Sequence, residues 1–100
     1  MIRIPLTKGA QRFSIMLGSS YCDISLIWRD AEEGGGWFMD IAKADGSAKA
    51  CGIPVLPGSD LFGQLRHRGL GHMYCTVNGR TDRAPAYDDM GGALSLYWEA

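Results

Sequence analysis

Apolar and polar residues alternate along most of this chain with a period of two. The longest such stretch spans residues 21–29, and only Ile27 breaks its pattern; the apolar phase holds Cys22, Ile24, Leu26 and Trp28. Successive side chains of a β-strand point to opposite faces of the sheet. Each alternating segment therefore predicts a strand with one face on a core and the other toward water or a partner.

The pattern predicts seven short strands, at residues 2–6, 12–17, 21–29, 37–42, 48–56, 72–77 and 94–99. Asp45-Gly46, between the fourth and fifth, is typical of a hairpin turn. Pro54 lacks a backbone N–H, so we expect an edge position or a bulge in the fifth strand. One short helical turn is expected near residues 59–66, where Leu61 and Leu65 are four residues apart.

These elements predict an all-β fold, a compact antiparallel sandwich or a partly open barrel. One hundred residues suit a single β domain covering 1–100. At this length burial is modest, and ordinary or marginal stability is expected.

Composition narrows the function by what it excludes. The formal net charge of -1 provides no field for recruiting nucleic acid, and 46% hydrophobic residues argue against disorder. No stretch resembles a signal peptide or a membrane span, so a cytoplasmic protein is expected. The three cysteines have no CxxC spacing, which predicts neither a disulfide framework nor a zinc site.

Catalytic patterns are also missing from the sequence. Asp88-Asp89 is a paired carboxylate, but such a pair in a loop more often binds its own backbone in a turn. No GxSxG elbow or phosphate-binding motif is present. The sequence therefore predicts no catalytic residues, no cofactor and no metal.

Aromatic residues fall in both phases of the alternation. Three tryptophans share the apolar phase and are expected in the core. Tyr21, Tyr74 and Tyr97 fall in the opposite phase, as do Ile27 and Phe38. Since tyrosine is enriched at interfaces, we interpret this phase as a second, partly apolar contact face.

The order of several short motifs resembles the small baseplate plug proteins of contractile-tailed bacteriophages, a family also carried by prophages. The resemblance covers essentially the whole chain, and its motifs are residues 2–6, 21–26, 35–41, 52–62, 85–91 and 96–98. Residues 66–72 and 80–84 are not part of it.

The resemblance implies a structural virion component, assembled in the bacterial host cytoplasm, that closes the tail-tube end near the hub. Its expected partners are hub, baseplate and tail-tube proteins, and further copies of itself, without nucleic acid or a membrane anchor. We expect residues 52–65 and 85–91 to be the docking elements, because distinctive loop sequence more often binds than packs. The candidate interface residues are therefore Phe62, Tyr87 and Asp88, together with Tyr21, Tyr74 and Tyr97.

Three other interpretations stay open at this point. A ligand-binding β module would use the three tyrosines as one platform. A small enzyme would bring His67 or His72 within hydrogen-bond reach of a carboxylate such as the Asp88-Asp89 pair. A different tail component, beside the hub or spike, would share the structural role but not the plug position.

Overall fold

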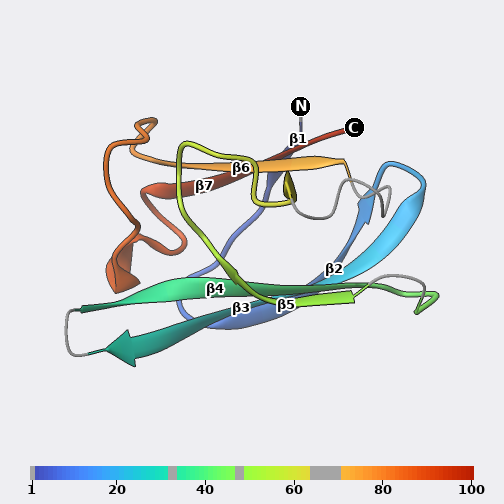
Figure 1. Cartoon of the computed structure of the whole chain (residues 1–100), viewed down its shortest axis with the longest axis horizontal. Coiled ribbons are helices and arrows are strands. Elements are labelled where there is room, and N and C mark those ends of the chain that lie inside the picture. Colours follow the sequence, from blue (N-terminus) through green and yellow to red (C-terminus); the bar gives the residue numbers. More distant parts are fainter. Residues whose placement is uncertain (1, 32–33, 47–48, 64–70) are drawn as a thin grey trace.

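The chain folds into two antiparallel β-sheets that lie one above the other (Figure 1). This computed structural model describes all residues except 1, 32–33, 47–48 and 64–70. The strands are β1 (Ile2–Ile4), β2 (Gln11–Leu17), β3 (Ser20–Ala31), β4 (Gly34–Lys43), β5 (Lys49–Pro54), β6 (His72–Val77) and β7 (Leu94–Glu99).

The larger sheet has the order β2-β3-β4-β5 and the smaller one β1-β7-β6. Neighbouring strands of the larger sheet follow one another along the chain, so it is a simple meander. In the smaller sheet β7 returns between β1 and β6, and thereby joins the two ends of the chain. The all-β prediction is confirmed, and the described strands form two separate sheets rather than a closed barrel.

The core lies between the sheets and is built from the apolar phase of each strand. In β3 and β4, every second side chain points into the core. In β6 and β7, every second side chain points into the same core from the opposite sheet. The largest fully buried side chains include Trp37, Phe62, Ile24, Leu26, Met39, Met73 and Leu96.

The buried cysteines behave as small hydrophobic residues. Cys22 and Cys75 both lie inside the core, whereas Cys51 is exposed. Burial raises the pKa of the Cys75 thiol to about 11, so it stays protonated and unreactive at neutral pH.

Each predicted strand is present, and two of them, β6 and β7, have the predicted bounds. β5 is an edge strand and its pairing with β4 is interrupted by a bulge between Met39 and Ile41, as Pro54 predicted. The expected helical turn lies partly outside the described residues; inside them, the Gly63 N–H donates to the Asp60 carbonyl. A 3-10 helix, η2 (Tyr87–Asp89), occupies a segment expected to be loop.

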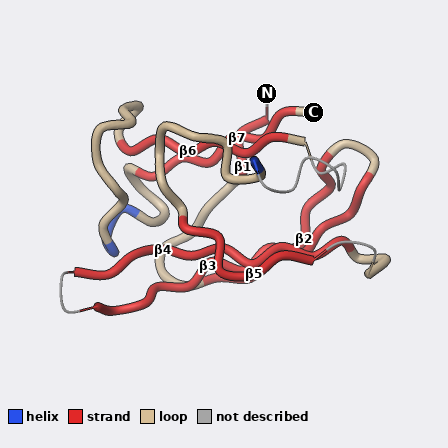
Figure 2. The backbone as a smooth tube through the Cα atoms, in the orientation of Figure 1, coloured by secondary structure: helices blue, strands red, loops and turns tan. Residues whose placement is uncertain are grey.

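A crossing segment, residues 55–63, connects the two sheets after β5. Figure 2 shows it leaving the lower sheet and rising to β6. It is fixed at both ends, because the Val55 N–H donates to Trp37 and the Leu61 N–H donates to Met73. No helix in the described part of the chain is long and apolar enough to cross a membrane.

Candidate docking site

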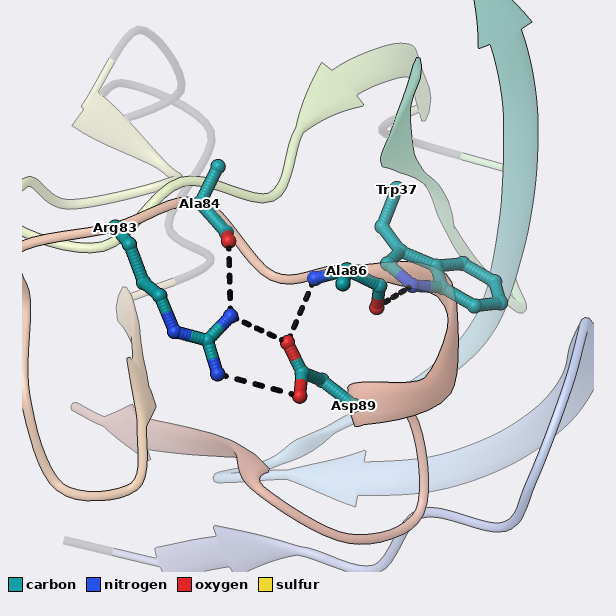
Figure 3. Close-up of polar contacts among 5 residues, drawn as sticks. All are labelled: Trp37, Arg83, Ala84, Ala86 and Asp89. Carbon is teal, nitrogen blue, oxygen red and sulfur yellow. Dashed lines mark hydrogen bonds and ion pairs between the residues drawn. The ribbon is translucent and has the colours of Figure 1, made fainter. Parts of the chain in front are cut away.

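Residues 83–89 form a loop that is held by hydrogen bonds beside the start of β4 (Figure 3). Arg83 makes a two-pronged contact with Asp89, with Nη1–Oδ2 and Nη2–Oδ1 distances of 2.7 and 3.4 Å. The same carboxylate accepts the Ala86 N–H at 2.6 Å. The Trp37 indole N–H then donates to the Ala86 carbonyl at 3.0 Å and ties the loop to the larger sheet.

These contacts explain the charge state of Asp89. The hydrogen bond from Arg83 lowers the pKa of Asp89 below its ordinary value, and the Ala86 N–H acts in the same direction. The carboxylate therefore serves the turn rather than proton transfer. This agrees with the turn interpretation of the Asp88-Asp89 pair; Asp88 itself is exposed.

An aromatic cluster stands behind this loop. Tyr87 stacks on Trp37 with ring centroids 5.5 Å apart and planes 16° apart. Trp28 meets both rings edge-on, at centroid distances of 5.5 and 5.6 Å. Offset-stacked and edge-to-face arrangements are the favoured aromatic geometries, so the cluster fixes half-exposed Tyr87 in one orientation.

A predominantly apolar groove of about 430 Å³ lies at the same end of the sandwich. Its walls come from four segments, residues 29–31, 35–38, 54–56 and 84–85. It thus lies where the start of the crossing segment meets the start of the 85–91 loop, so both docking elements expected from the sequence border it.

Apolar side chains continue from this groove onto the outer face of the larger sheet. Ile27, Phe38 and Pro54 oppose one another across β3, β4 and β5. Leu56, on the groove wall, is 48% exposed. The Arg29 guanidinium lies 5.0 Å above the Phe38 ring centroid, which shields the ring from one side. The groove and this row together can hold an apolar side chain of a protein partner.

Asp60 fixes the far end of the crossing segment on the edge of β6. Its Oδ1 accepts the N–H groups of Phe62 and Met73, both at 2.9 Å, and its Oδ2 lies 2.7 Å from His72 Nδ1. Burial acts to raise the pKa of Asp60, but the hydrogen bonds from His72, Met73 and Phe62 outweigh it and lower the pKa below 3.8.

This network predicts acid sensitivity. The folded pKa of Asp60 is depressed, so its contribution to stability is present above 3.8 and is lost as pH falls through the folded pKa. We expect urea unfolding of the wild type to shift to lower urea concentrations on acidification, and that of Asp60→Asn to shift less. Equal shifts for the two proteins would contradict the assignment.

A comparison with protein families gives a match that extends over residues 1–100. The matching family is described as cyanophage baseplate Pam3 plug gp18. The chain belongs to this family. A comparison with curated proteins gives no match. The chain is therefore a phage baseplate structural protein and a component of the virion tail, as its motif order indicated.

A baseplate plug works through contacts with other proteins. The residues that the sequence suggested for such contacts lie in different parts of this structure. Tyr87 stacks on Trp37, which lines the groove, but Tyr87 and the exposed Asp88 themselves line a separate pocket with Lys8, Gly9 and Met90. Phe62 is 0% exposed and belongs to the core, so it offers no surface to a partner in this structure. The sequence did not predict whether the Phe62 side chain points inward, because Phe62 lies outside any strand and so has no alternating pattern.

The three tyrosines do not form one platform. Tyr21 lies on the outer face of the larger sheet, opposite Met16. Tyr74 and Tyr97 oppose each other on the outer face of the smaller sheet, which faces the other way. A ligand module that uses all three on one surface does not match this geometry.

The histidine and the carboxylate that the structure brings together are also not the pair that the enzyme interpretation named. A histidine and a carboxylate do come together, but they are His72 and Asp60, and Asp60 is already engaged by two backbone N–H groups. His67 lies outside the described residues. Within the described ranges no group of three metal-ligating side chains gathers. The structural family favours a role other than catalysis.

Sequence reasoning included Leu56 in the docking element 52–65 but did not single it out, and it missed the contact of Arg29 with Phe38. Leu56 follows a strand that ends at Pro54, where the alternation no longer predicts which way a side chain points. Pro54, Pro57 and Gly58 were the available signal, because such residues end a strand and leave an apolar neighbour outside the regular sheet.

Proposed function

We propose that this baseplate protein is the plug that closes the tail-tube end at the central hub. The observation that carries the proposal is the family match across all 100 residues, since the family is one of baseplate plugs. Assembly in the host cytoplasm, and a single domain over residues 1–100, are parts of the same proposal.

The proposed contacts are with hub and tail-tube proteins through the docking site. We define this site as the groove, whose wall includes Leu56, together with the row of Ile27, Phe38 and Pro54 and with Tyr87, which stacks on the groove residue Trp37. A plug must bind by burying shape-complementary surface, and a rigid aromatic residue beside an apolar pocket is a typical centre for such a contact. The formal charge of -1 gives no reason to expect nucleic acid as the partner.

Deletion of the gene from the phage or prophage tests this proposal. Tails assembled without the protein are expected to have an open tube end, and particles are expected to lose DNA or fail to mature. Expression of the wild-type chain from a plasmid should restore both. Normal, closed tails in the deletion strain would overturn the plug role, and a missing spike with a closed tube would favour a hub- or spike-adjacent component instead.

A further inference from the structure

The open edges of the two sheets are not equally protected. An edge strand exposes unpaired backbone groups, and proteins usually blunt it with short length, proline, bulges or covering loops. β1 has three residues and is followed by Pro5. β5 carries a bulge, Lys49 and Pro54. On β6, Asp60 and Leu61 occupy the N–H and the carbonyl of Met73, and Arg80 occupies those of Val77.

β2 is the exception. It is seven residues long, pairs with β3 without a bulge, and contains no proline. The Tyr21 carbonyl accepts the N–H of Ala44 beyond β4, so the odd-numbered residues of β3 bond to β4 and the even-numbered ones to β2. The backbone groups of Arg12, Ser14 and Met16 consequently face outward. No backbone group of the described residues outside the β2–β3 ladder bonds to them.

The side chains of β2 are also incompletely covered. Phe13 and Ile15 pack against the core from the inner face but stay only half buried. Met16, on the outer face beside Tyr21, is 53% exposed. The strand therefore leaves both backbone and apolar side chains for a further strand to cover.

The pattern of β2 is symmetric about Ser14. An antiparallel copy centred there pairs Ser14 with Ser14 and Arg12 with Met16 through the outward backbone groups. It also places Phe13 opposite Ile15 on the inner face, an aromatic–aliphatic pair of the favoured kind. The aliphatic stem of Arg12 from one copy covers the exposed Met16 of the other, and no like charges meet at these positions.

We propose that β2 pairs with β2 of a second copy of this chain, so that two four-stranded sheets join into one across a two-fold axis at Ser14. We assign the partner strand to a second copy of this chain because β2 is complementary to itself: Phe13 meets Ile15 on the inner face, and the uncharged Ser14 lies at the centre. Such a contact is isologous, which closes at a dimer rather than growing into a fibre. The inference does not depend on the plug role, because no residue of the docking site belongs to β2; the groove is lined by β3, β4, residues 54–56 and residues 84–85.

Sedimentation equilibrium of the purified full chain over a range of concentrations tests this pairing. We expect the wild type to form a dimer of the 10.9 kDa chain. Ser14→Pro removes an outward N–H without removing a bond to β3, so we expect dimerisation to weaken at least about tenfold. The matched control, Ser14→Ala, loses the same hydroxyl bond to Asp23 but keeps the N–H, and should still dimerise.

A second pair of variants decides the question if Ser14→Pro does not fold. Met16→Lys places a cation opposite Arg12 of the other copy at both ends of the contact, whereas Met16→Gln has similar length without charge. Only the lysine variant should weaken the dimer. A wild-type protein that stays monomeric at all concentrations would overturn the proposal. This holds even if β2 binds a strand of another protein instead. So would dimers that folded Ser14→Pro or Met16→Lys leaves unchanged.

Discussion

Replacing Phe62 with alanine is expected to destabilise the fold by about 3–5 kcal/mol, the range typical of a truncated, fully buried phenylalanine. The Phe62 side chain lies in the core between the sheets, and its backbone N–H is held by Asp60. Its loss leaves a cavity at the point where the crossing segment reaches β6. Urea unfolding followed by circular dichroism measures the change in the free energy of unfolding.

The Phe62 result separates a core role from a docking role. A stabilised background keeps Phe62→Ala folded, and in that background we expect normal incorporation into tails. An unfolding free energy within about 0.5 kcal/mol of the wild type, the usual range for surface changes, would contradict the core assignment. Leu56→Ala is a suitable control, since Leu56 is about half exposed and its truncation should change stability little.

Replacing Leu56 with glutamate is expected to have the opposite effects: little change in stability but a large loss of incorporation into tails. The exposed side chain tolerates a charge in the isolated protein, so the unfolding free energy should change by no more than about 0.5 kcal/mol. In the tail, the carboxylate would be buried without a partner at the apolar docking site, and incorporation should fall at least about tenfold. Quantitative mass spectrometry of purified tails measures the ratio of this protein to the tube protein.

Leu56→Met is the matched control, because it keeps an apolar side chain of similar volume and should be incorporated normally. Equal incorporation of Leu56→Glu and the wild type would show that the groove is not a contact surface. A glutamate variant that is also unfolded would instead show that Leu56 has a structural role at the start of the crossing segment.

The regular strands could be predicted because the pattern that marks a strand lies within a few consecutive residues. The alternation of Cys22, Ile24 and Leu26 reports which face of β3 is inside without reference to any other segment. Pro54 similarly reports an edge strand through its missing N–H. These features require no knowledge of how the sheets pack.

The docking site depends on relations between segments, and the sequence predicted it only in part. Alternation assigned Tyr21 and Tyr74 to outer faces, but it carries no information on which sheet each strand joins. The contact from Trp37 to Ala86 spans 49 positions along the chain, so η2 and its orientation follow from tertiary packing. The burial of Phe62 could not be predicted from the sequence, because residues in a loop have no regular period that indicates which side chains point inward.

A cryo-electron microscopy reconstruction of intact, unejected tails tests the central claim most directly. We predict density for this fold across the end of the tail tube at the hub, with Leu56 and Tyr87 buried against a neighbouring chain. Density for the chain elsewhere in the baseplate, or at the tube end with these residues facing solvent, would contradict the account.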